Sequence, residues 1–201
     1  MTAAALSTKE IRLYSDIELI SSATSGREAG FEELVRRYQK QITGYVYRIV
    51  GDYDSSLDVT QEVFIKVYNS LHRYSSEYKF STWLYRIAHN AAIDHLRRNS
   101  INTQSLETEN ADGTYQLQIE CTGRSPEKDR EISEWRTEIG QVIKRLPDAY
   151  KQLILLRHAN DLSYDEIAEV TGLPLGTVKN RLFRARDMMR QIMLERGFGG
   201  I

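Results

Sequence analysis

The sequence predicts an all-α protein of two small helical domains joined by a flexible linker. Hydrophobic residues recur at three- and four-residue steps toward both ends of the chain, which is the periodicity of amphipathic helices. The segment between them loses that periodicity, and no convincing alternating strand or internal repeat is found. We therefore expect a tail and the start of the first helix in residues 1–24, a domain in 25–98, a linker in 99–127 and a second domain in 128–196.

Three helices are expected in the first domain. Apolar residues at helical spacing mark residues 31–49, and a second set marks residues 57–71. The stretch 74–80 is polar and aperiodic, so it predicts a loop. Ser81 or Thr82 is suited to cap the third helix.

The predicted linker is acidic and poor in apolar residues. It contains five acidic residues and one basic residue, together with many Ser, Thr, Asn and Gln. Such a segment buries too little apolar surface to offset the entropy of ordering it. The net charge of the whole chain is −1 because the acidic linker outweighs two mildly basic flanking segments. The net charge therefore does not exclude a nucleic-acid partner.

Several classes of protein are disfavoured by what the chain lacks. No apolar stretch has the length that a bilayer requires, and the N-terminus has no secretory signal, so we expect a cytoplasmic protein. The single cysteine, Cys121, excludes an intramolecular disulfide and a cysteine-rich zinc knuckle. We expect no cofactor and no metal.

The sharpest local pattern, in residues 162–193, predicts a helix-turn-helix. Ser163 and Glu166 have the spacing of a capping box at the start of a helix. Gly172 suits the left-handed residue at which that helix ends, and Pro174 suits the start of the next. These signals predict two short helices joined by a tight turn.

The second helix of this pair has an apolar stripe and a cationic face. Val178, Leu182, Ala185 and Met189 form the stripe that is expected to be buried. A surface helix with solvated charges is one interpretation of the basic residues. The agreement of cap, turn glycine and one-sided cations favours contact with DNA, because a major groove admits such a helix. The residues left outside are Lys179, Asn180, Arg181, Phe183, Arg184 and Arg186.

Two blocks of the chain resemble one family. DVTQEVFIKVYNSLHRY (58–74) followed by KFSTWLYRIAHNAAIDHLRR (79–98) resembles the second conserved region of the extracytoplasmic-function (group 4) sigma factors of the sigma-70 family. LPDAYKQLILLRHANDLSYDEIAEVTGLPLGTVKNRLFRAR (146–186) resembles the fourth region of the same family. With residues 31–50, the resemblance covers most of the chain.

The resemblance implies a transcription initiation subunit and not an enzyme. Such a protein binds core RNA polymerase, through the clamp helices of the β′ subunit and the β flap, directs it to promoter DNA and helps to open the duplex. Family members are commonly held inactive by an anti-sigma factor, often one bound to the membrane, in a stress or envelope response. By similarity, Asp58, Gln61 and Glu62 contact the polymerase, although the two acids alternatively form an ordinary surface pair, and Phe64 is expected in the core.

The same resemblance assigns the two promoter elements. Tyr74, Tyr78, Phe80, Trp83 and Tyr85 are suited to stack on unpaired bases of the −10 element, although for Trp83 a role in holding the helix to its core is favoured. Asn90 is the candidate for a base contact, with an inert surface amide as the alternative. The predicted −10 set is Lys66, Tyr74, Lys79, Arg86 and Asn90. The predicted −35 set has Lys179, Asn180, Phe183 and Arg184 at base edges and Tyr164, Arg181 and Arg186 at phosphates.

Two other classes of protein remain as alternatives. An ordinary helix-turn-helix regulator explains residues 162–193 but leaves the block 58–98 without a role. An enzyme is the other class, but the four histidines lack the spacing of a metalloprotease and Cys121 has no base near it in sequence.

Overall fold

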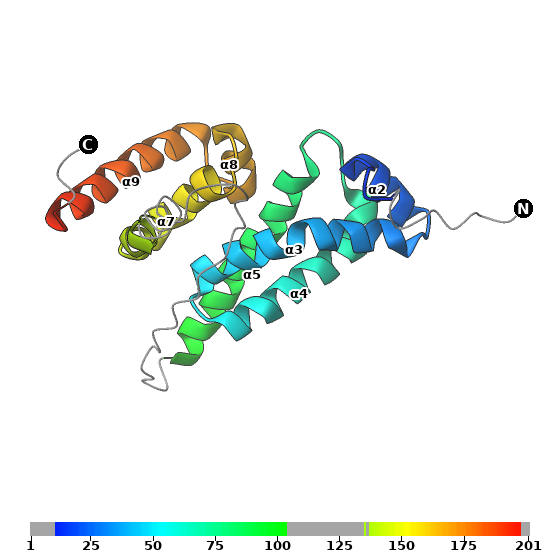
Figure 1. Cartoon of the computed structure of the whole chain (residues 1–201), viewed down its shortest axis with the longest axis horizontal. Coiled ribbons are helices and arrows are strands. Elements are labelled where there is room, and N and C mark those ends of the chain that lie inside the picture. The colour runs from blue at the N-terminus through cyan, green and yellow to red at the C-terminus, as the bar shows by residue number, and fades with distance from the viewer. Residues whose placement is uncertain (1–10, 104–134, 136, 198–201) are drawn as a thin grey trace, which may run out of the picture. The chain divides into compact units, whose positions relative to one another are not determined.

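The computed structural model describes residues 11–103, 135 and 137–197, and its regular elements are helices (Figure 1). The all-α prediction is therefore confirmed. The described chain forms two compact units, which are treated separately below. Most of the predicted linker lies outside the described residues. None of the described helices combines the length and apolar character needed to cross a membrane.

The first unit begins with a complete helix, α2 (Asp16–Thr24), where the sequence pattern suggested a tail and the start of the first helix. Ser15 caps α2 through a capping box, in which its backbone N–H donates to Glu18 at 2.7 Å. The chain then turns at Gly26, which has a φ of 87°, and enters α3 (Glu28–Val50). The Ser-x-x-Glu spacing that revealed Ser163 and Glu166 also occurs here and would have located α2.

Helix α3 packs against α4 (Tyr53–Ser70) and α5 (Phe80–Thr103), which also pack against each other (Figure 1). Two residues separate α3 from α4, and each of them caps one of the two helices. Gly51 ends α3 with a φ of 86°, and the carboxylate of Asp52 accepts the N–H of Ser55 at 2.8 Å. Phe64 lies in the core, as predicted. A short 3₁₀ turn, η1 (Leu71–Arg73), and the predicted loop then lead into α5.

The third helix begins at Phe80, so the predicted caps Ser81 and Thr82 both lie inside it, and the buried Phe80 belongs to the helix and not to the predicted loop. Its ring meets that of Tyr38 at 5.5 Å, and Tyr85 meets the buried Tyr45 at 5.4 Å. Phe80 and Tyr85 are each only 2% exposed. The prediction that these two rings stack on unpaired bases is therefore wrong for the folded domain, in which they hold the helices together.

The second unit contains helical residues 137–144 followed by four further elements. The periodic apolar residues of the second domain include Trp135 and Ile139, but both side chains are exposed. Val142 in the helix and Leu146 in the turn that follows it are buried instead. The later elements are α7 (Asp148–Ile154), the π-turn η2 (Leu155–Ala159), α8 (Tyr164–Thr171) and α9 (Leu175–Glu195).

Helices α8 and α9 form the predicted helix-turn-helix. Ser163 and Glu166 make both bonds of the capping box, and Gly172 ends α8 with a φ of 68°. Pro174 is the N-cap of α9. The stripe of α9 is buried at Val178, Leu182 and Ala185, and Met189 is half-buried.

Candidate nucleic-acid interfaces

The outward face of α9 is a surface of cations around one exposed ring. Phe183 is 71% exposed although it is a large apolar side chain, and it stands one turn from Lys179. Burial of the opposite stripe fixes this face outward, so the side chains cannot turn into the core. Arg181 is half-buried at the edge of the face. The exposed set is Lys179, Asn180, Phe183, Arg184 and Arg186.

Tyr164 joins the start of α8 to this face. Its hydroxyl accepts a hydrogen bond from Nη2 of Arg186 at 2.9 Å. The guanidinium of Arg157, from η2, lies over the ring at 5.5 Å from its centroid. The hydrogen bond from Arg186 is the main reason that the pKa of Tyr164 is lowered. Two predicted phosphate contacts are thus brought together, and Arg157 joins them as a residue that the sequence did not single out.

A second group of residues, predicted to bind the −10 element, lies on one face of α5. Trp83, Arg86 and Asn90 follow one another at steps of three and four, so they share a side of the helix. Asn90 is exposed, while Arg86 and Trp83 are half-buried. An amide, a guanidinium and an indole on one face offer hydrogen bonding, charge and a stacking surface.

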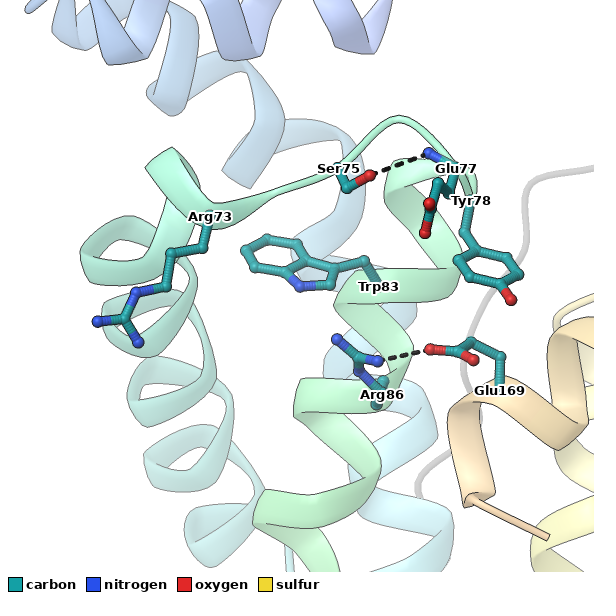
Figure 2. A pocket seen from close by; sticks show the side chains of 7 residues that line it. All are labelled: Arg73, Ser75, Glu77, Tyr78, Trp83, Arg86 and Glu169. Carbon is teal, nitrogen blue, oxygen red and sulfur yellow. Dashed lines mark hydrogen bonds and ion pairs between the residues drawn. The ribbon is translucent and has the colours of Figure 1, made fainter.

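Aromatic contacts place Tyr74 at the end of this face. Its ring lies 5.6 Å from the ring of Trp83, and its hydroxyl donates to the carbonyl of Tyr78 at 2.8 Å. The indole of Trp83 projects from α5 toward the side on which Arg73 lies, with Arg86 one turn further along the helix (Figure 2). The loop is further fixed by a bond from the Glu77 N–H to the Ser75 hydroxyl. Trp83 is therefore a half-buried residue that packs against the ring of Tyr74.

Lys79 and Lys66 are placed differently from the α5 face. Lys79 is an exposed loop residue that directly precedes α5. Lys66 lies on α4 and donates to Glu62 at 2.7 Å. Arg98 approaches the same carboxylate at 3.6 Å. A predicted DNA contact and a predicted polymerase contact are therefore ion-paired with each other.

The outward face of α4 is partly apolar. Asp58, Gln61, Ile65 and Tyr68 recur at steps of three and four residues and are all exposed. Ile65 is 61% exposed and Tyr68 53%, and the Tyr68 ring packs on Phe31 at 4.9 Å. Exposed apolar side chains among polar ones are typical of a protein interface. The sequence reasoning missed Ile65 and Tyr68, although both fall outside the buried stripe of α4.

No candidate metal site is found in the described part of the chain. Its His, Cys, Asp and Glu side chains do not gather in groups of three that could hold a metal ion. His89 is buried and its Nδ1 lies 2.9 Å from the hydroxyl of Tyr45. Burial lowers the pKa of His89 to about 4, so its imidazole is neutral at pH 7.

The sequence matches two family models in the same order as the two domains. The model described as Sigma-70 region 2 matches residues 34–101, and the model described as Sigma-70, region 4 matches residues 136–189. The first spans the bundle that carries Asn90, and the second spans the helix-turn-helix.

Curated relatives are similar along most of the chain. The ECF RNA polymerase sigma factor SigW of Bacillus subtilis is 35% identical over 86% of this chain and 93% of its own length. The ECF RNA polymerase sigma-E factor of Haemophilus influenzae is 38% identical over 87% of this chain and 93% of its own. The sigma-E factor of Escherichia coli is 36% identical over 86% and 91%.

Two solved structures share the fold. CnrH, solved in complex with the cytosolic domain of CnrY, aligns with a TM-score of 0.63 over 89% of this chain and 96% of that chain, at 21% identity. The sigma factor RpoE of Bartonella quintana, solved with the anti-sigma factor NepR, aligns with a TM-score of 0.66 over 81% and 96%, at 17% identity.

Proposed function

Because the chain belongs to the extracytoplasmic-function RNA polymerase sigma factors, we propose which of its surfaces meets the polymerase, the −10 element and the −35 element. Sigma factors are DNA-binding subunits that direct core RNA polymerase to promoters and are not enzymes. The cationic face of α9 is the observation that carries the assignment.

The −35 element is read by α9. A helix of this width fits the major groove, and the side chains that reach base edges are Lys179, Asn180, Phe183 and Arg184. Arg184 is suited to a bidentate bond with guanine, and Phe183 to contact with a thymine methyl group. Tyr164, Arg181 and Arg186 hold phosphates and fix the register of the helix on the duplex.

The −10 element is bound by the α5 face and the loop before it. Asn90 is exposed on the face that also carries Trp83 and Arg86, which supports a base contact beside a stacking platform and a phosphate contact. Tyr74 extends this platform through its ring contact with Trp83. Lys79, in the loop, and Lys66, on α4, supply further positive charge for the backbone of the opened strand.

The polymerase is bound by the outward face of α4. Asp58, Gln61 and Glu62 provide polar and acidic groups for the basic side of the β′ clamp helices, and Ile65 and Tyr68 supply the apolar centre. The second domain meets the β flap. An anti-sigma factor that covers the α4 face would block polymerase binding. The sigma factor RpoE that shares this fold was solved in complex with the anti-sigma factor NepR.

The test is reconstitution of the full chain with core RNA polymerase that lacks its own specificity subunit. Transcription starts are then mapped across genomic DNA. We expect reproducible starts preceded by two motifs at constant separation. If the chain binds duplex DNA tightly but does not associate with core polymerase, it is instead a helix-turn-helix regulator.

A further inference from the structure

Asp16 ties the first helix of the first domain to α3. One of its carboxylate oxygens accepts a bond from Nη1 of Arg37 at 3.0 Å, and the other accepts the hydroxyl of Tyr38. Nη2 of Arg37 also donates to the backbone carbonyls of Arg12 and Tyr14, at 3.0 and 2.7 Å. These bonds join residues that are far apart in sequence, so they fix α2 and the turn before it against α3.

Glu33 holds Arg37 from the other side. Its side chain is only 4% exposed and accepts Nε of Arg37 at 3.1 Å. The pKa of Glu33 is lowered to about 2, first by the bond from Arg36 and also by the bond from Arg37, so the carboxylate is charged at pH 7. A guanidinium that is bonded on both sides is ordered, and it determines where the carboxylate of Asp16 lies.

Tyr38 carries this link to the start of α5. Its ring meets that of Phe80 edge to face, at 5.5 Å. Phe80 is 2% exposed, and its ring also meets the rings of Tyr74 and Trp83, both at 5.8 Å. Tyr74 and Trp83 are the two rings assigned above to the opened −10 strand. A single buried ring therefore separates the partner of Asp16 from both of them.

Helix α2 also lies close to the segment that carries Tyr74. It packs against η1, which ends one residue before Tyr74. The charge of Asp16 raises the pKa of Tyr74, after the larger effect of burial. A ring that is held in place before binding loses less entropy when a base stacks on it, so such contacts favour capture of the strand.

We propose that Asp16 and Tyr38 are positioning residues for promoter opening. Their bond acts through Phe80 and holds Tyr74 and Trp83 in the arrangement that receives the unpaired −10 strand. The inference rests on the proposed −10 role of α5 and the loop before it, and extends that role to α2, which carries none of the residues assigned to DNA. Loss of the bond loosens the two rings and leaves the −35 face and the polymerase face unchanged.

The first measurement is acrylamide quenching of Trp83 fluorescence in the full chain. Trp135→Phe is the background, so that one tryptophan remains. Tyr38→Phe keeps the ring beside Phe80 and removes only the bond to Asp16. We expect a larger quenching constant for Tyr38→Phe and for Asp16→Ala than for the background. Asp16→Asn retains an oxygen that accepts the bond, so its quenching should stay close to that of the background.

The second measurement is open-complex formation by core RNA polymerase carrying each variant, on a promoter identified by the start-site mapping. Tyr38→Phe and Asp16→Ala should each reduce open complexes on the order of 3- to 10-fold, as substitutions within a contact network commonly do. The double variant should lose little more than either single one, because both remove the same bond. Affinity for core polymerase, measured by competition with labelled wild-type chain, should not change. Tyr74→Ala removes one of the two rings and should be at least as defective.

Val59→Ala is the control for a general loss of stability. Val59 is a buried residue in the first half of α4, and none of the contacts described above involves it. The shortened core side chain should lower the thermal midpoint of the first domain more than Tyr38→Phe does. Open-complex formation by Val59→Ala should nevertheless match that of the wild type below this midpoint.

The outcomes distinguish the inference from the proposed function. Unchanged Trp83 quenching in Tyr38→Phe, a loss of core affinity in that variant, or an equal loss of open complexes in Val59→Ala would overturn the inference. If Tyr74→Ala is defective and Tyr38→Phe is not, the positioning role is wrong and the −10 assignment stands. If Tyr74→Ala forms open complexes like the wild type, the −10 assignment is itself wrong and the inference fails with it.

Discussion

Lys66 and Glu62 form an ion pair of 2.7 Å across one turn of α4. Lys66 is assigned above to promoter DNA and Glu62 to polymerase, so one short contact joins two proposed functions. Arg98 of α5 approaches the same carboxylate, at 3.6 Å. The pKa of Glu62 is lowered, chiefly by the hydrogen bond from Lys66.

The pair is expected to matter for binding more than for folding. Exposed ion pairs contribute less than about 1 kcal/mol, and both side chains here are more than a third exposed. A double-mutant cycle with Glu62→Gln and Lys66→Gln, followed by urea unfolding, should give a coupling energy of less than about 1 kcal/mol. Glu62→Gln should nevertheless weaken association with core polymerase, and Lys66→Gln should not.

Asp94→Asn is the matched control for this cycle. Asp94 pairs with Arg97 at 3.6 Å on α5, and both side chains are more than half exposed. Its loss should leave polymerase association unchanged. Equal weakening by Asp94→Asn and Glu62→Gln would show that net charge, and not the α4 face, governs the association.

Gly30 is expected to tolerate no side chain, because α2 and α3 cross there. A Cβ at this position would lie 2.6 Å from the carbonyl oxygen of Leu19 and 2.9 Å from the Cβ of Ser22. We expect Gly30→Ala to lower the free energy of unfolding of the first domain by about 1–3 kcal/mol. Trp83 fluorescence in a Trp135→Phe background reports that domain alone.

Gly140→Ala is the comparison for Gly30→Ala. A Cβ at Gly140 would meet nothing within 4 Å, and the residue is helical. Alanine should stabilise the second domain there by up to about 1 kcal/mol, since it is the better helix former. Destabilisation by both substitutions would contradict the steric account of Gly30.

The stability of the first domain should depend on pH through His89. Its pKa falls from 6.5 to about 4 on burial, so unfolding takes up a proton between these values. Stability is therefore fully present above pH 6.5, falls as the pH drops toward 4, and changes no further through this group below 4. The expected loss between pH 7 and pH 5 is about 2 kcal/mol.

Urea unfolding at a series of pH values measures this loss, with His89→Gln as the variant. Glutamine has no titrating group and can accept the bond from Tyr45, so the slope between pH 7 and pH 5 should flatten. Glu33 should not obscure the result. Its pKa is lowered to about 2, first by the hydrogen bond from Arg36, so its contribution is lost only below about pH 4.5. An unchanged slope in His89→Gln would exclude His89 as the cause.

The helix-turn-helix was predictable from sequence because its signals are local. A capping box at Ser163 and a glycine at 172 act within a few residues and need no tertiary context. The roles of the aromatic residues were not predictable in the same way. Phe80 and Tyr85 occur in the same segment as Trp83, and only the packing of α3 against α5 decides which rings are buried.

The surface of α4 shows a second reason why some site residues could not be predicted from the sequence. Ile65 is as hydrophobic as its buried neighbours, so only its position outside the buried stripe of α4 indicates that it faces solvent. Arg157 was missed for a related reason. The π-turn that brings it over Tyr164 has no sequence signature of its own, and the contact follows from the path of the chain between α7 and α8.

Arg184 is expected to determine one position of the −35 element. Arg184→Ala should cost about 1–3 kcal/mol at the base pair that it contacts and little at the others, because only that pair loses its bidentate bond. Transcription by the reconstituted polymerase from promoters varied at each −35 position measures this. Arg190→Ala, six residues further along α9, should lower activity evenly or not at all. An even loss across all positions for Arg184→Ala would make Arg184 a phosphate contact.

Ile65 is expected to be a principal apolar contact with polymerase. Its side chain is 61% exposed, so Ile65→Ser should change the free energy of unfolding by less than about 0.5 kcal/mol. Truncation of an apolar side chain at the centre of an interface commonly costs about 2 kcal/mol or more, which corresponds to a loss of about 30-fold in affinity for core polymerase. Competition against fluorescently labelled wild-type chain measures this loss. Ile17→Ser on α2 is the matched control, because Ile17 is also 61% exposed and lies away from α4 in sequence. Similar affinities for the two variants would place the polymerase contact on another surface of the first domain.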